Sequence, residues 1–389
     1  MKQFDIVISG GAMAGGTLAL AIARLYPHLS VAVVEAQTPD SAAHPGFDAR
    51  SIALAQGSVA KLKTWGLWPL LSANAEPIEH IHVSDQGHFG LTRMAASDIG
   101  HDALGYVVEL ATVGQAYHQA LSANANIHYL LPDSLASSEA TPEGVRLTTR
   151  SGEVLSAKLL VVADGAQSAM ATALNLNETT HDMEQVALIA NVETAVAHQS
   201  RAFERFTADG PLALLPMSQG RSSLVWCLPP EKANAMLALP EAQFLAELQR
   251  AFGWRLGALT RVGKRDSYPL TVRHRPQVIA HHAVVIGNAA QTLHPIAGQG
   301  FNLGLRDVAG LLQCLAFDFP LGSPAMLNHY QDSRASDRQR TLAMTSGLVG
   351  LFSNDALPLA ALRNAGLLMM GTCSAAKRPL LKQAIGWTK

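Results

Sequence analysis

The first thirty-five residues constrain the fold of this chain most, because two short apolar runs flank a glycine cluster and a helical segment. Residues 4–8 have the composition of a buried strand, and residues 14–26 continue with apolar side chains at helical density until Pro27. Residues 31–34 form a second apolar strand, which Glu35 closes. Two near-continuous apolar strands joined through a helix are typical of a parallel sheet covered on both faces. The sequence therefore predicts an α/β fold with a Rossmann-like domain.

The loop between the first strand and the helix has the spacing of a dinucleotide fingerprint. Glycines at such a loop allow a tight turn, a close approach of backbone to pyrophosphate, and packing of the helix on the strand. The residues of this loop are Gly10, Gly11, Ala12, Met13, Ala14 and Gly15, with Ala12 where the middle glycine is expected. Glu35, at the end of the second strand, is placed to bind ribose hydroxyls. A plain strand-to-helix turn is the alternative. Because no second unit of this kind follows, one tightly held FAD is a better prediction than NAD.

The rest of the chain predicts a discontinuous arrangement. Residues 159–163 and 283–286 are further strands of the first sheet, whereas residues 212–215 and 223–228 flank a turn at 218–221 and indicate an inserted antiparallel layer. Helical patterns dominate from residue 299 onward. We therefore expect an FAD-binding domain from residues 1–75, 101–180 and 270–335, a substrate domain from 76–100 and 181–269, and a C-terminal helical region at 336–389.

Composition excludes several classes of protein. A formal net charge of −1 gives no electrostatic reason to expect nucleic acid as a partner. Three scattered cysteines, Cys227, Cys314 and Cys373, indicate neither a disulfide framework nor a metal site, and favour reduced thiols in a cytoplasmic protein. Glycines interrupt the uncharged stretch 6–23, so neither a signal peptide nor a membrane span is expected there.

The end of the chain leaves two interpretations open. Residues 348–381 mix Leu, Met and Ala with few charges, and three basic residues lie at 377, 378 and 382. This composition is compatible with peripheral contact to the inner membrane or with covering a groove. Ordinary core helices explain the same pattern.

Three later segments make the predicted dinucleotide-binding fold more specific. They are F-D-A-R-S-I-A-L at 47–54, V-A-D-G-A-Q-S at 162–168, and a segment beginning with Gly287 and Asn288 that ends with H-P-I-A-G-Q-G-F-N-L-G-L-R-D at 294–307. Together they resemble the FAD-dependent aromatic hydroxylases related to para-hydroxybenzoate hydroxylase, and among them most closely the ubiquinone-biosynthesis hydroxylases. The resemblance extends over nearly the whole chain. It departs at Ala12, and at Asn288, where the wider superfamily has aspartate.

The resemblance implies a Rossmann-like FAD-binding domain of the para-hydroxybenzoate hydroxylase type, an inserted mixed or antiparallel-sheet substrate domain, and a helical C-terminus. Besides the loop and Glu35, the implied FAD-binding residues are Arg50, Asp164, Gly165, Gly287, Asn288, Gly298, Gln299, Gly300, Phe301 and Asn302. Amides at the start of the helix near residue 299 would stabilise negative charge on a reduced flavin. Pro295 would lie beside the ring, and His294 is a candidate base with a structural role as its alternative. Leu212, Leu214, Val225 and Trp226 are expected to line an apolar substrate cavity.

The implied reaction is a ring hydroxylation. NAD(P)H would reduce the FAD, O2 would add at flavin C4a, and the resulting hydroperoxide would give one oxygen to a polyprenylated methoxyphenol, without a metal. Other ubiquinone-biosynthesis proteins are expected partners. A flavin-dependent reductase of an isoprenoid substrate and a non-catalytic lipid-binding scaffold are the rival interpretations. The residues leave the choice between NADH and NADPH, the ring position, the prenyl length and the oligomeric state open.

Overall fold

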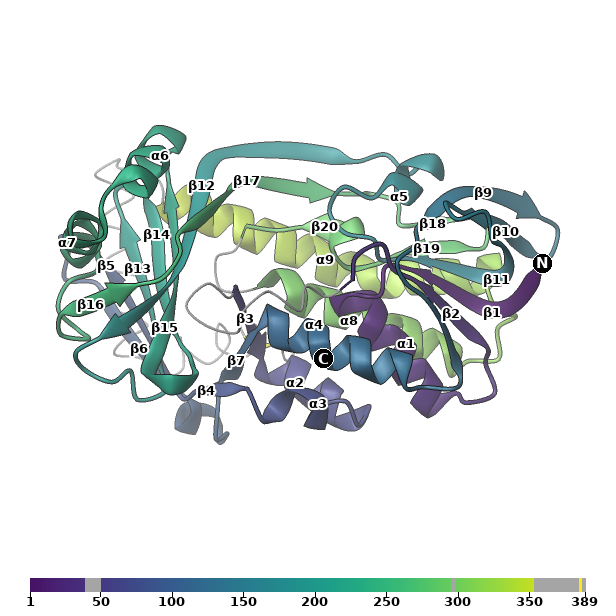
Figure 1. Cartoon of the computed structure of the whole chain (residues 1–389), viewed down its shortest axis with the longest axis horizontal. Helices are drawn as coiled ribbons and strands as arrows, with labels where there is room; N and C mark the ends of the chain where they lie inside the picture. Colours follow the sequence, from purple (N-terminus) through teal and green to yellow (C-terminus); the bar gives the residue numbers. More distant parts are fainter. Residues whose placement is uncertain (39–49, 295–298, 353–384, 387–389) are drawn as a thin grey trace.

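The computed structural model describes residues 1–38, 50–294, 299–352 and 385–386 of the 389-residue chain. Within these residues the strands form three sheets (Figure 1). The first sheet has the strand order β18-β19-β11-β1-β2-β8, and β10 and β9 extend it from β11. Its strands are β1 (Lys2–Ser9), β2 (Val31–Val34), β8 (Ile127–Leu130), β9 (Leu135–Thr141), β10 (Gly144–Thr149), β11 (Val154–Val162), β18 (Ile279–Ala280) and β19 (Ala283–Val285).

The central strands of this sheet are parallel, and their apolar carboxyl-terminal halves are buried, as their sequences predict. β1 pairs in parallel with β2 and β11, and β11 pairs in parallel with β19. Ile6, Val7 and Ile8 have no exposed surface. The helix α1 (Met13–Leu25) contacts β1 and β2 as well as α4 (Leu110–Ser122) and α8 (Gln299–Leu315). The first βα turn therefore lies at the carboxyl edge of a rigid parallel sheet.

The second sheet is mixed and has the order β20-β17-β12-β15-β14-β13-β5-β6, with β16 paired to β12. β13 and β5 run parallel, and the other pairs are antiparallel. Its strands are β5 (His80–Asp85), β6 (Leu91–Ala95), β12 (Thr179–Thr194), β13 (Arg201–Thr207), β14 (Gly210–Pro216), β15 (Arg221–Leu228), β16 (Leu259–Val262), β17 (Asp266–His274) and β20 (Gln291–Thr292). The helices α6 (Pro230–Ala238) and α7 (Glu241–Phe252) pack on one face of it and close a second apolar core.

A small third sheet, β3-β7-β4, lies between the two larger ones. Its strands are β3 (Ser51–Ala55), β4 (Glu76–Ile78) and β7 (Gly105–Glu109). The remaining helices are α2 (Gln56–Thr64), α3 (Pro69–Ser72), α5 (Ala169–Ala173) and α9 (Pro324–Phe352), with short 3₁₀ turns η1 (Ala96–Ile99), η2 (Ser218–Gly220) and η3 (Gly287–Ala289).

The predicted fold class is confirmed, and the strands show how its parts are joined. β12 and β17 are long paired strands that extend from the second sheet toward the first (Figure 1). β17 and β20 pair in the second sheet, although most of their residues fall in the range 270–335 that was predicted to belong to the FAD-binding domain. The proposed domain boundaries therefore remain predictions.

The C-terminal part of the chain is described only as far as Phe352 and at two residues beyond. α9 begins at Pro324, twelve residues before the predicted C-terminal helical region. Most of the apolar stretch 348–381 lies outside the described residues. Across the part that is described, no helix is both long enough and apolar enough to cross a membrane.

Candidate active site

One cavity of about 960 Å³ connects the fingerprint loop with the second sheet. At one end it is lined by Gly10, Ala12 and Glu35, and at the other by apolar residues of β13, β14 and β15. The third sheet and the start of α8 form the wall between these ends. Its volume is at the upper end of the range for small-molecule sites, roughly 300–1,000 Å³.

The fingerprint loop makes a turn that requires glycine at Gly10. This residue has a φ of +97°, and a Cβ there would come within 2.7 Å of the carbonyl carbon of Ala163. Ala12 has a φ of −74°, which any residue adopts, and its methyl group is exposed to the cavity. The side chain of Ala12 therefore fits at a position where glycine is usual. Gly15 has to be small because it packs on the carbonyl of Gly10.

Glu35 lies directly beside this loop. Its Oε2 accepts the N–H of Gly11 at 2.6 Å, and its Oε1 accepts the N–H of Gln37 at 2.8 Å. A carboxylate has about four acceptor positions, so both oxygens can still accept hydroxyl hydrogens from a ligand. The predicted pairing of loop and acidic residue is present in the structure.

The middle of the cavity is lined by Asp164, Gly165, Gly287 and Asn288, as predicted for a cofactor site. Burial is the main cause that raises the pKa of Asp164 above its usual value. Gly287 has a φ of +60°, and a Cβ there would meet Ala14 of α1 at 2.9 Å. The segment that enters α8 can therefore approach the fingerprint helix closely only because residue 287 is glycine.

The start of α8 faces the same cavity through Gly300, Phe301 and Asn302. A Cβ at Gly300 would meet no atom within 4 Å, so the space beside it is open to a ligand. The first N–H groups of a helix have no partners within the helix and attract negative charge. The side chain of Asn302 accepts the N–H of Ala55 at 2.8 Å and donates to the carbonyl of Ala53 at 2.9 Å, and its contact with a flavin ring stays a prediction. Asn302 therefore ties α8 to β3.

Two of the predicted residues in this segment, Pro295 and Gly298, lie outside the described residues, as does the side chain of Gln299. Arg50 is exposed and does not line the cavity. Its charge nevertheless acts on Tyr268, a cavity residue, where it opposes the rise of the pKa to about 12 that burial and Cys227 produce. Arg50 therefore lies near the site, and its contact with a flavin stays a prediction.

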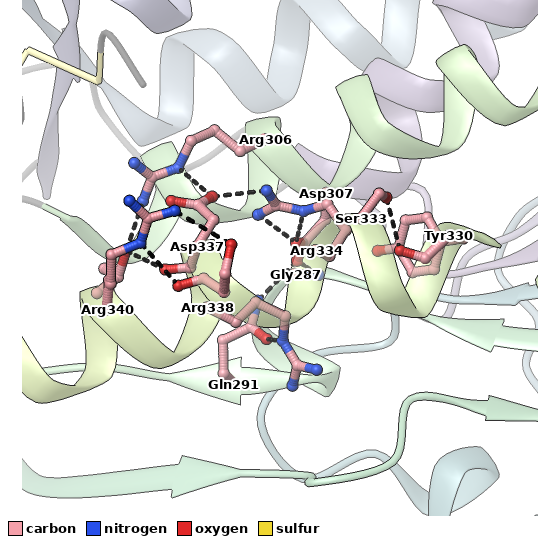
Figure 2. A network of polar contacts seen from close by, with 12 residues as sticks. Gly287, Gln291, Arg306, Asp307, Tyr330, Ser333, Arg334, Asp337, Arg338 and Arg340 are labelled. Carbon is pink, nitrogen blue, oxygen red and sulfur yellow. Dashed lines mark hydrogen bonds and ion pairs between the residues drawn. The ribbon is translucent and has the colours of Figure 1, made fainter. Parts of the chain in front are cut away.

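A buried polar network anchors the segment between β19 and α8 (Figure 2). Asp307 accepts the backbone N–H of Gly287 at 3.1 Å and the side-chain amide of Gln291 at 2.6 Å. Its other oxygen accepts two N–H groups of Arg334 from α9, at 3.0 and 3.1 Å. Arg338 donates to Gln291 Oε1 at 2.6 Å. Asp307, the last residue of the sequence motif, thus holds the cavity-lining segment that begins at Gly287 without lining the cavity itself.

His294 is buried at 1% exposure and does not line the cavity, although its neighbours Thr292 and Leu293 do. Its Nε2 lies 3.4 Å from Gln185 Oε1, and burial lowers its pKa to about 4. An imidazole in these surroundings is neutral at physiological pH. This position favours the structural alternative over the role of a base.

Three of the four residues predicted to line the substrate cavity lie on the opposite face of the second sheet. Leu212, Leu214 and Trp226 pack in the core between the sheet and α6 and α7, while Val225 lines the cavity. Side chains alternate between the two faces of a strand, so the neighbours of these residues face the cavity instead. On β14 and β15 the cavity residues are Pro211, Ala213, Leu215, Val225 and Cys227.

Several lining residues were not predicted, notably Arg150, Glu204, Cys227 and Tyr268. Arg150 lies near the Glu35 end, and its N–H donates to the carbonyl of Ser134, another lining residue. Alternation along residues 201–206 indicates that Glu204 shares a face with Ala202 and Phe206. An acidic residue among apolar ones on one strand face was the signal that could have identified it.

The residues present fit a flavin dinucleotide. The glycine turn leaves no room for a side chain at Gly10, two helix N-termini face the cavity, and a carboxylate lies at the end of β2. This set of donors and acceptors suits a pyrophosphate and a ribose.

Comparisons with known proteins agree with this geometry. Residues 3–345 match the model of the FAD binding domain family. Over 392 aligned residues, 36% are identical to ubiquinone hydroxylase UbiL of Rhodospirillum rubrum, an alignment that covers 100% of this chain and 91% of that protein. The chain is 32% identical to 3-demethoxyubiquinol 3-hydroxylase of Escherichia coli, with 98% of each chain covered. The structure of p-nitrophenol 4-monooxygenase from Pseudomonas putida superposes with a TM-score of 0.81 at 19% identity, covering 99% of each chain, and supports the fold.

The family match spans most of the chain, and the alignments with the two hydroxylases span nearly all of it. The chain therefore belongs to the FAD-binding domain family and, within it, to the FAD-dependent hydroxylases of ubiquinone biosynthesis.

Proposed function

We propose that this enzyme hydroxylates the ring of a polyprenylated methoxyphenol in ubiquinone biosynthesis. The observation that carries the proposal is one continuous cavity, which begins at a dinucleotide loop and ends at an apolar sheet surface. The segments H-P-G-F-D at 44–48, R-A-F-E-R-F at 201–206 and G-W-R-L-G at 253–257 resemble those of 2-octaprenyl-6-methoxyphenol hydroxylase.

In this proposal the nucleotide end of the cavity holds the FAD. Backbone amides at Ala12, Met13 and Ala14 bind the pyrophosphate at the start of α1. Glu35 would accept the ribose hydroxyls, and the N–H groups of the first turn of α8 would stabilise negative charge on the flavin. The bound FAD supplies the activation of O2 with electrons from NAD(P)H.

The other end of the cavity binds and orients the substrate. Ala213, Leu215 and Val225 provide an apolar surface that excludes water and suits a ring with a prenyl tail. Because such substrates partition into membranes, we place the enzyme in the cytoplasm at the inner-membrane surface, where other enzymes of the pathway would be its neighbours.

Two experiments test the proposed function. Deletion of the gene followed by lipid extraction should show accumulated polyprenyl-methoxyphenol and loss of ubiquinone, while normal ubiquinone would contradict the proposal. With purified holoenzyme and a short-prenyl methoxyphenol, we expect NAD(P)H oxidation, O2 uptake and a product that has gained one oxygen atom. Turnover that requires no O2 would instead indicate a reductase.

A further inference from the structure

Glu204 lies in the middle of the cavity-facing surface of the second sheet. In the sheet register it is opposite Ala213 of β14 on one side and Val83 of β5 on the other. All three residues line the cavity. The carboxyl group therefore projects from the centre of the surface that we assign to the substrate.

The surroundings of this carboxyl group are apolar. Ala202 and Phe206, which share its face of β13, also line the cavity, and Val225 follows Ala213 in the same row of the sheet. Burial among these side chains raises the pKa of Glu204 to about 7.

No cation is paired with this carboxylate in the part of the chain that the structure describes. The adjacent Arg205 is directed elsewhere, because its Nε donates to the carbonyl of Ala251 at 2.8 Å. The titratable groups that line the cavity from neighbouring strands are Cys227 of β15 and Tyr268 of β17. Glu204 is half-buried, and partial desolvation of a carboxylate without a cationic partner costs stability. Ionisable groups in such surroundings are concentrated at functional sites.

We propose that Glu204 is the general base that accepts the proton of the substrate's ring hydroxyl, an inference that rests on the proposed function. The O–H bond of the phenol breaks, the proton moves to a carboxylate oxygen of Glu204, and the electron pair stays on the phenol oxygen. The resulting phenolate makes the ring more electron-rich at the moment when it attacks an electrophilic oxygen. The proton then passes to solvent when the hydroxylated product leaves.

The other candidate bases in the described residues are less suitable. His294 lies outside the cavity lining, and Tyr268, with a pKa of about 12, stays protonated. Burial raises the pKa of the Cys227 thiol, which is therefore protonated as well. Asp164 belongs to the middle of the cavity, beside Ser168 at the start of α5. A base with a pKa near the working pH transfers protons most effectively, and Glu204 meets this condition.

The test compares three variants of the holoenzyme. Glu204→Gln keeps the shape and removes the base, Glu204→Asp keeps a carboxylate on a shorter side chain, and Glu139→Gln makes the same chemical change on exposed β9, outside the cavity. We expect Glu204→Gln to retain FAD, because it removes a buried charge. Its kcat should fall about 100-fold or more with a small change in KM, since general bases contribute roughly 10²–10⁴-fold. Glu204→Asp should keep part of the activity, and Glu139→Gln all of it.

Three readouts separate a base from a structural residue. The acidic limb of the kcat pH profile should disappear in Glu204→Gln and persist in Glu204→Asp. The phenolate absorbance that appears when the methoxyphenol binds to the oxidised wild-type enzyme should be lost in Glu204→Gln. A fluorinated, more acidic phenol should restore much of the turnover of Glu204→Gln, because it ionises without help.

The outcomes distinguish this inference from the proposed function. A Glu204→Gln enzyme with kcat within about threefold of wild type, together with an unchanged phenolate signal, overturns the assignment of Glu204 alone. Wild-type enzyme that does not hydroxylate the methoxyphenol overturns both. Should Glu204→Gln lose FAD, the Glu204→Asp enzyme decides. A lowered kcat with a retained acidic pH limb and recovery of turnover with the acidic phenol supports the base, whereas wild-type kcat with no acidic limb contradicts it.

Discussion

At the scale of single residues, Gly10 controls whether the dinucleotide end can form. Its φ of +97° and the Ala163 carbonyl behind it exclude a side chain. We predict that Gly10→Ala weakens FAD binding by more than about tenfold, because the added Cβ would overlap the Ala163 carbonyl and force the pyrophosphate loop to move. The ratio of flavin to protein absorbance after purification measures this effect.

Gly152 provides the matched control for that prediction. It has a similar φ of +91°, but a Cβ there would meet no atom within 4 Å. Gly152→Ala should therefore lose some stability through backbone strain and retain its FAD. Equal FAD loss in both variants would contradict the role of crowding at Gly10.

His294 predicts how stability depends on pH. Its pKa of about 4 in the folded protein lies below the ordinary value of 6.5, so the unfolded chain binds more protons between these values. The stabilisation is complete above pH 6.5 and is lost as the pH falls toward 4. Between about pH 7.5 and pH 5 this group alone should remove about 2 kcal/mol from the unfolding free energy.

The comparison with His294→Gln isolates this contribution, because the variant shares all other titratable groups. Urea unfolding of both proteins at the two pH values gives the measurement. The pH-dependent loss should be about 2 kcal/mol smaller in the variant. An identical pH dependence would show that His294 does not titrate with a lowered pKa.

At the scale of elements, the network around Asp307 connects α8, α9 and the segment from β19 to β20 (Figure 2). We predict that Asp307→Asn lowers the unfolding free energy by roughly 1.5–3 kcal/mol, because buried Arg334 loses one of its two carboxylate partners and keeps the other, Asp337. Combined with Arg334→Met, the loss should be smaller than the sum of the single losses. Chemical denaturation of the single and double variants measures it.

Asp332→Asn is the control on the same helix. Asp332 is exposed on α9, so this variant should stay within about 0.5 kcal/mol of wild type. A loss at Asp307→Asn no larger than the loss at Asp332→Asn would mean that the network contributes little to stability.

The elements also show where sequence reasoning reaches its limit. The first strands, the fingerprint loop and Glu35 were predictable because each has one pattern of spacing and composition. The two faces of β14 were not, because Leu212 and Leu214 on the core side and Pro211, Ala213 and Leu215 on the cavity side are all apolar. Which face receives α6 and α7 depends on contacts between distant parts of the chain. Glu204 was missed for the same reason, since its neighbourhood is assembled from three strands.

At the scale of the whole molecule, the cavity is walled by all three sheets. β1 contributes Gly10 at its end, β3 contributes Ala53 and Leu54, and β13 contributes Glu204. A cofactor bound along the nucleotide end therefore contacts elements that belong to different sheets. Ligands that bind only the folded state stabilise it by mass action.

We therefore predict that removing FAD lowers the unfolding free energy of the whole chain and that returning FAD restores it. At a free FAD concentration of about 100 times its Kd, the difference should be about 2.7 kcal/mol, with one unfolding transition in both states. FMN, which lacks the adenosine part, should restore less, because it leaves the Glu35 end of the cavity unfilled. At the same FAD concentration, the increase should be smaller by about 1.3 kcal/mol or more in Gly10→Ala. Equal denaturation midpoints with and without FAD would contradict FAD binding to the folded chain, since a ligand that binds only the folded state must stabilise it.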